Sequence, residues 1–86
     1  MNWKIKIDTT AIKYLNKIDK NIQEKLITGI DNLSSIDNPR KIGKALQGKY
    51  VGFWRYRIGD YRLICEIQDK IITILIIKIG HRKDVY

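Results

Sequence analysis

The chain has 86 residues, a hydrophobic fraction of 44% and a formal net charge of +8. This length suits one small domain over residues 1–86 with a modest core, and the composition excludes a disordered chain. The strong positive charge indicates an acidic partner, namely a nucleic acid, an anionic membrane surface or an acidic protein; the alternative is a basic but otherwise ordinary surface.

The compartment follows from cysteine usage and from hydropathy. The single cysteine cannot form an internal disulfide, and the first residues show no cleavable signal pattern, so we expect a reducing cytoplasm. The isoleucine-rich run 71–79 is too short to span a bilayer and contains Thr73 and Lys78. We interpret it as a central strand and expect no membrane partner.

The first half of the chain predicts one strand and two helices. Residues 2–7 alternate between apolar and polar side chains, which is typical of a half-buried strand. Asp8 or Thr9 is a candidate cap for a first helix, which ends near residues 19–21. A second helix over residues 22–33 has apolar residues at spacings of four, four and three. Gly29 lies within it at a cost of about 1 kcal/mol relative to alanine, which indicates close packing against a neighbour.

A basic linker follows the second helix. Asp37-Asn38-Pro39 is a stop and turn signal. Residues 40–62 then contain seven Lys or Arg and one acid, Asp60. We expect the basic residues of the linker to bind RNA, and these are Arg40, Lys41, Lys44 and Lys49.

Gly59-Asp60 separates two alternating runs and predicts a two-residue β-hairpin. Counting outward from this turn pairs Arg57 with Arg62 and places Arg55 opposite Ile64. Like charges directly opposite each other destabilise a sheet, so an anion between the two guanidinium groups is one interpretation of the pair. The alternative is two solvated side chains that splay apart.

The same alternation assigns the faces of the last strands. Trp54, Tyr56 and Ile58 are expected to cover the helices. Cys65 belongs to the core face of the next strand as a small buried apolar residue. The following turn at Gln68-Asp69 decides the last strand. A two-residue loop places Leu75, Ile77, Ile79 and His81 on the arginine face, and a three-residue loop reverses this assignment.

Together these elements predict an α+β fold of order strand, helix, helix, strand, strand, strand. The two helices pack on one face of a small, mainly antiparallel sheet, and the last three strands form a meander. The other face stays open and basic.

The residues on that face suit phosphodiester chemistry. No metal signature and no glycine-rich phosphate loop is present, so we expect no metal and no cofactor. Arginine binds phosphate in a bidentate manner, histidine titrates near neutrality, and tyrosine stacks on bases or transfers a proton. The catalytic candidates are Arg55, Arg57, Arg62, His81, Arg82 and Tyr86. The simpler alternatives are that the arginines only position RNA, that His81 caps a strand end, and that Tyr86 is frayed or anchored by packing.

These residues carry a resemblance. The stretch KALQGKYVGFWRYRIGDYRLICEI, followed by IGHRKDVY, resembles the RelE/ParE toxin superfamily, specifically the RelE-like toxins of bacterial and archaeal toxin–antitoxin pairs. The resemblance implies a small ribonuclease that enters the ribosomal A site and cuts the mRNA there. It also implies an antitoxin partner that wraps the toxin and blocks the basic face.

The family's functional positions match residues before the hairpin turn, after it and in the tail, namely Arg55, Arg57, Arg62, Arg82 and Tyr86, with His81 beside them. The best-understood members of the family have lysines at the first two positions. Because arginine practically cannot lose its proton, neither Arg55 nor Arg57 is assigned as a general base. We expect the three strand arginines to hold the phosphate, His81 and Tyr86 to transfer protons, and Arg82 to stabilise the leaving group.

Two other functions remain open at this point. One is a ParE-like protein that poisons DNA gyrase without nuclease activity, and the other is an RNA- or ribosome-binding module without catalysis. The complete tail GHRKDVY favours the nuclease.

Overall fold

A computed structural model describes residues 2–85. Three α-helices and five strands follow the chain in the order β1 (Lys4–Ile7), α1 (Thr9–Lys17), α2 (Lys20–Ser34), α3 (Pro39–Ile42), β2 (Lys44–Ala45), β3 (Trp54–Ile58), β4 (Tyr61–Gln68) and β5 (Thr73–His81). Two single 3₁₀ turns, η1 (Gly48–Tyr50) and η2 (Asp69–Ile71), join β2 to β3 and β4 to β5. The predicted α+β class is confirmed.

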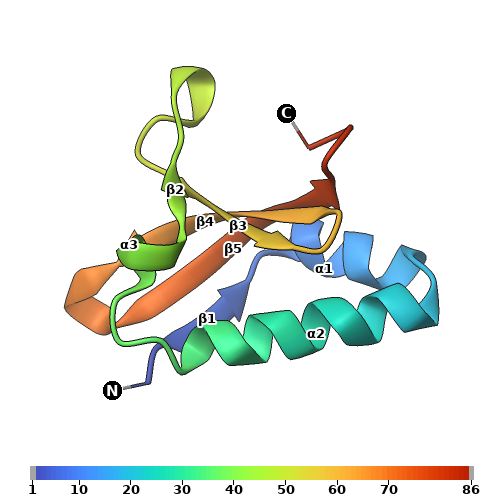
Figure 1. Cartoon of the computed structure of the whole chain (residues 1–86), viewed down its shortest axis with the longest axis horizontal. Helices are drawn as coiled ribbons and strands as arrows, with labels where there is room; N and C mark the ends of the chain where they lie inside the picture. Colours follow the sequence, from blue (N-terminus) through green and yellow to red (C-terminus); the bar gives the residue numbers. More distant parts are fainter. Residues whose placement is uncertain (1, 86) are drawn as a thin grey trace.

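The strands form one sheet of order β1-β5-β4-β3-β2. Strands β3, β4 and β5 form the expected antiparallel meander, and β1 runs parallel to β5 at one edge. Figure 1 shows α1 and α2 on one side of this sheet, whereas the β2–β3 connection and the carboxyl-terminal tail rise from the other side. Sequence reasoning missed β2 and α3, because elements of two and four residues are too short to show a period.

The core lies between the two long helices and the sheet. It includes Leu15 and Leu26 from the helices and Leu63 and Ile76 from the strands. The expected close approach at Gly29 is confirmed, because a Cβ atom there would lie 2.5 Å from Cδ1 of Ile58 on β3. Glycine therefore lets α2 lie against the sheet at this point.

A second buried contact holds the basic linker against the core. The phenol of Tyr56 donates a 2.7 Å hydrogen bond to the carbonyl of Pro39, at the start of α3. Burial raises the pKa of this phenol well above its usual value. The linker is thereby fixed at the β2 edge of the sheet.

The hairpin register is confirmed, with Arg57 opposite Arg62 and Arg55 opposite Ile64. Gly59 in the turn adopts a φ of 57°, which glycine allows without strain.

The predicted faces of β5 are only partly right. Leu75 lies opposite Glu66 on the arginine face, as expected. The register then shifts between Ile64 and Cys65, which pair with Lys78 and Ile76, so that Ile77 has no cross-strand partner. Such a β-bulge reverses the alternation beyond it.

As a result, Ile79 and His81 pair with Leu63 and Tyr61 on the helix-covered face. The expectation that they share the arginine face is wrong. The loop between β4 and β5 does not cause this reversal. Four residues separate the paired Gln68 and Thr73, and an even number of loop residues assigns the faces of β5 in the same way as a two-residue loop. Among residues 2–85, none of the helices is both long enough and apolar enough to cross a membrane.

Candidate active site on the open face of the sheet

Cations from four strands gather on the sheet face opposite α1 and α2. Residues paired across neighbouring strands lie on the same face. One row joins Lys44, Arg55, Ile64 and Lys78, and the next joins Arg57, Arg62 and Gly80. We call the charged members of these rows the basic palm: Lys44, Arg55, Arg57, Arg62 and Lys78.

Within the part of the chain that the structure describes, no carboxylate forms an ion pair with the basic palm. The pairs Arg40–Asp69 and Arg82–Asp60 lie outside it. Two like charges of the palm, Arg57 and Arg62, are directly opposite each other. The field of the palm is therefore available to an external anion.

Two of the palm arginines differ in how their donors are used. Nη1 of Arg62 donates to the carbonyls of Gly59 and Tyr61, both at 3.0 Å, which holds the guanidinium beside the hairpin turn. Nε of Arg55 is buried and has no hydrogen-bond partner among the described residues. A buried donor without an acceptor is costly, so Nε of Arg55 is an unsatisfied hydrogen-bond donor within the palm.

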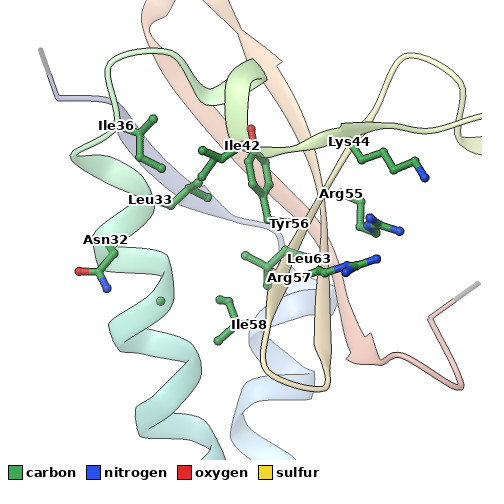
Figure 2. A pocket seen from close by; sticks show the side chains of 11 residues that line it. Asn32, Leu33, Ile36, Ile42, Lys44, Arg55, Tyr56, Arg57, Ile58 and Leu63 are labelled. Carbon is green, nitrogen blue, oxygen red and sulfur yellow. The ribbon is translucent and has the colours of Figure 1, made fainter.

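A cavity of about 580 Å³ borders the palm, between α2 and the edge of β3 that β2 leaves uncovered. Figure 2 shows Lys44, Arg55 and Arg57 pointing to one side of the sheet. Ile58 and Leu63 point toward α2. The cavity thus passes from an apolar wall to a cationic mouth.

The carboxyl-terminal tail folds back beside the palm. The main-chain N–H groups of Asp84 and Val85 donate to the carbonyl of His81 at 2.8 and 3.0 Å. Val85 is fully buried and packs on Gly80, where a Cβ atom would lie 3.3 Å from Cβ of Val85. Gly80 is the cross-strand neighbour of Arg62, so the tail reaches the end of the palm.

Arg82 lies at the same end. Its main-chain N–H donates to the carbonyl of Asp60 at 2.8 Å, and its Nε lies 3.9 Å from the Asp60 carboxylate. Tyr86, the other tail candidate, lies outside the described residues.

The structure separates His81 from the other candidates. Its ring packs edge-on against Tyr61, with 5.4 Å between the ring centroids, and its Nδ1 accepts from the main-chain N–H of Lys83 at 3.2 Å. Tyr14 of α1 approaches the main chain of His81 from the helix side, and burial raises the pKa of that phenol. His81 therefore organises the turn into the tail, on the face away from the palm.

Of the four linker residues predicted to bind RNA, one belongs to the basic palm and three lie elsewhere. Lys44 belongs to the palm, whereas Arg40 pairs with Asp69 at 2.8 and 2.7 Å and lies 5.9 Å from the ring of Trp54. Trp54 pairs with Cys65 and so marks the helix-covered face. Lys41 is exposed on α3, and Lys49 is exposed on η1.

Sequence reasoning missed two residues of this face. Lys78 was interpreted only as part of a central strand, and the bulge turns it to the palm. Tyr50 of η1 reaches the palm through a 3.3 Å hydrogen bond between its phenol and Nζ of Lys78. The residue type of Tyr50 was visible, but no local pattern indicated where its connection folds.

Among residues 2–85, no group of three or more His, Cys, Asp or Glu side chains is placed to hold a metal ion. What the palm provides is a set of cations, and arginine and lysine side chains are common protein ligands of phosphate.

Comparison with known proteins identifies the family. A sequence profile described as the ParE toxin of the type II toxin–antitoxin system, parDE, matches residues 5–86. The chain belongs to the RelE/ParE toxin superfamily. Toxin RelG of Mycobacterium tuberculosis is 31% identical to this RelE/ParE toxin over 87 residues, which cover 100% of this chain and 98% of the relative.

Solved structures of RelE proteins share the fold. The toxin–antitoxin complex RelBE2 of M. tuberculosis contains a chain with a TM-score of 0.83 and 29% identity, covering 95% of this chain and 100% of that one. A chain of the archaeal RelE–RelB complex of Pyrococcus horikoshii has a TM-score of 0.74 and 26% identity, and the match covers 99% of this chain and 100% of that one. A mutant of E. coli RelE in the free state has a TM-score of 0.75 and 18% identity, and the match covers 96% of this chain and 86% of that one. At this identity the likeness shows the fold alone.

Proposed function

We propose that this RelE/ParE toxin is a ribosome-dependent endoribonuclease that cleaves mRNA in the A site. The observation that carries the proposal is that Arg55, Arg57 and Arg62 share one face of the sheet, where no carboxylate of residues 2–85 forms an ion pair with them. A site for a single phosphodiester needs this concentration of positive charge.

In the proposed reaction the 2′-oxygen of a nucleotide attacks the neighbouring phosphorus. The bond from phosphorus to the 5′-oxygen breaks, leaving a 2′,3′-cyclic phosphate and a free 5′-hydroxyl. The proton of the 2′-hydroxyl passes to a base, and the departing 5′-oxygen receives a proton. The three strand arginines bind and neutralise the pentacovalent phosphate.

Proton transfer needs groups other than the arginines, because a guanidinium practically cannot release a proton. His81 is not assigned this role, since it lies on the opposite face. Tyr86 remains the candidate, because it follows Val85, which packs beside the palm. Arg82, at the same end of the sheet, is assigned to stabilise the negative charge that develops on the leaving oxygen, which then takes its proton from solvent water.

A cognate antitoxin is the expected partner. The similar chains of M. tuberculosis and P. horikoshii were solved as toxin–antitoxin complexes. The cavity between α2 and β3, with its apolar wall and cationic mouth, suits a segment that carries apolar and acidic side chains. A short acidic protein encoded in the adjacent reading frame would be the first candidate.

The test is cleavage of mRNA on translating ribosomes, with 5′ ends mapped by primer extension and 3′ ends examined for cyclic phosphate. Arg55→Gln should slow cleavage by about 10²–10³-fold, the usual cost of removing one donor to a developing negative charge. Lys25→Gln, on the exposed side of α2, is the charge-matched control and should cleave normally.

The main alternative is gyrase poisoning, because the family profile that matches the chain is the one described as the ParE toxin. The same protein should therefore be assayed with DNA gyrase and supercoiled plasmid. Gyrase-dependent DNA breaks together with intact mRNA would overturn the nuclease assignment. Translation arrest without cleaved mRNA would support the non-catalytic binding module instead.

A further inference from the structure

An aromatic ring stands at the rim of the basic palm between two lysines. Nζ of Lys49 lies 5.2 Å from the centroid of the Tyr50 ring, and Nζ of Lys78 lies 5.8 Å from it. Lys78 also bonds the Tyr50 phenol at 3.3 Å. Through Lys78, the ring is placed next to the row that contains Arg55.

Contacts within the β2–β3 connection, which carries Tyr50, hold the ring in place. Phe53 packs edge-on against it, with centroids 6.5 Å apart. The N–H of Phe53 donates to the carbonyl of Tyr50 at 3.0 Å, and the N–H of Leu46 donates to the carbonyl of Phe53 at 3.1 Å. Gly48 and Gly52 adopt φ values of 65° and 94°, which this tight path requires. The ring orientation is thus set before any ligand binds.

The surroundings of Tyr50 differ from those of a core tyrosine. The residue is half-buried and lies outside the core cluster, and its near neighbours include two cations. A ring with one lysine near it and another at its hydroxyl, beside a row of cations, matches the combination of stacking surface and positive charge by which proteins bind single-stranded nucleic acid. The ring stacks on a base, and the cations contact the phosphates on either side.

We infer that Tyr50, Lys49 and Lys78 form a nucleobase subsite for single-stranded RNA, next to the phosphate held by the basic palm. The inference rests on the proposed function, because the palm must hold the RNA backbone for the subsite to be used. Tyr50 stacks on the base of a nucleotide adjoining the bound phosphate. Lys78 exchanges its bond to the phenol for a contact with the RNA backbone.

The experiment measures how tightly the 86-residue toxin binds two ten-nucleotide RNAs. Both carry 2′-O-methyl groups, which prevent cleavage, and one has abasic sites in its central positions. Tyr50→Leu should weaken binding of the base-containing RNA by about tenfold, the usual value of one stacked base. The same substitution should leave binding of the abasic RNA unchanged. Tyr50→Phe, which keeps the ring, should restore most of the lost affinity.

Lys78→Met gives an independent measurement, in case Tyr50→Leu disturbs the fold. This substitution should weaken the binding of both RNAs equally. It should also reduce the slope of log Kd against log salt concentration by about 0.7, the value for one contact to a phosphate of a single strand. Lys70→Met, an exposed lysine of η2, is the matched control and should change neither RNA.

The outcomes separate the subsite from the proposed function. If Tyr50→Leu weakens both RNAs equally, the ring only anchors its connection and the subsite is rejected. If Arg57→Gln abolishes binding while the Tyr50 and Lys78 variants bind normally, the palm holds RNA but the subsite does not exist. If the wild-type toxin shows no preference for bases, the subsite is rejected, and normal mRNA cleavage on ribosomes would still uphold the proposed function.

Discussion

Arg57→Gln is expected to stabilise the fold while it slows mRNA cleavage. Arg57 and Arg62 are directly opposite each other across β3 and β4, and Arg57 is exposed. Directly opposed residues of a sheet have Cβ atoms about 4.5–5.5 Å apart. Two unit charges at a comparable separation of about 5–7 Å repel each other by about 0.6–0.8 kcal/mol in water. Physiological salt screens roughly half of this over a Debye length of about 8 Å. Removing one charge should therefore raise the free energy of unfolding by about 0.3–0.4 kcal/mol, or the Tm by about 2 °C.

The activity should move in the opposite direction. On programmed ribosomes, Arg57→Gln should cleave mRNA about 10²–10³-fold more slowly, because the phosphate loses one of its charged donors. Arg57→Lys is the matched variant that keeps the charge, so its Tm should stay near that of the wild type. Its cleavage should fall between the two, since an ammonium group lacks the bidentate fork of arginine.

Thermal unfolding, followed by circular dichroism at low and high salt, provides the measurement. The stability gained by Arg57→Gln should disappear near 1 M NaCl, where the Debye length is about 3 Å. Lys25→Gln should show neither the gain nor its salt dependence. A lower Tm for Arg57→Gln at low salt would refute the like-charge argument. Full cleavage by the same variant would refute the role of the palm.

Two further predictions concern the core. Gly29→Ala should lower stability by about 1 kcal/mol, because overpacking against Ile58, typically 1–3 kcal/mol, outweighs the helix propensity gained. Combining it with Ile58→Ala in a double-mutant cycle should reveal a favourable coupling, whereas a raised Tm for Gly29→Ala alone would contradict the close contact. Burial raises the pKa of the Cys65 thiol, so a thiol reagent at pH 8 should modify the protein only as fast as it unfolds. Rapid labelling of the native toxin would show that the thiol is accessible.

The palm also bears on how the toxin is controlled. Unpaired positive charge on a folded surface attracts any acidic segment, and the adjoining cavity adds apolar area to that attraction. An antitoxin that uses both features would compete with RNA for the same arginines. Inhibition would then weaken as salt increases, in parallel with RNA binding.

The hairpin shows what local sequence determines. Gly59-Asp60 specifies a turn, and alternation on both sides of it sets the register, so the opposition of Arg57 and Arg62 followed directly. The approach of Gly29 to β3 was also visible, because a glycine within an apolar helical pattern needs a packing reason. Both features depend on residues close together in sequence, or on a single residue whose properties allow few explanations.

The β-bulge shows a feature of the fold that local sequence does not predict. Nothing in the run 71–79 marks Ile77 as the residue without a partner, because every neighbour is equally suited to a strand. The extra residue is accommodated where β5 pairs with β4, and it turns Lys78 toward the palm and His81 toward the helices. One shift of register thus exchanged a predicted site residue for one that had been overlooked.

Periodicity and turn chemistry act over a few residues, and they were enough to predict the fold class, the meander and the arginine pair. The packed fold was needed to show that β1 lies parallel to β5, that Arg40 is bound to Asp69, and that Tyr50 reaches Lys78. These contacts join segments far apart in the chain. Their free energy depends on how the layers pack, which no short window of sequence contains.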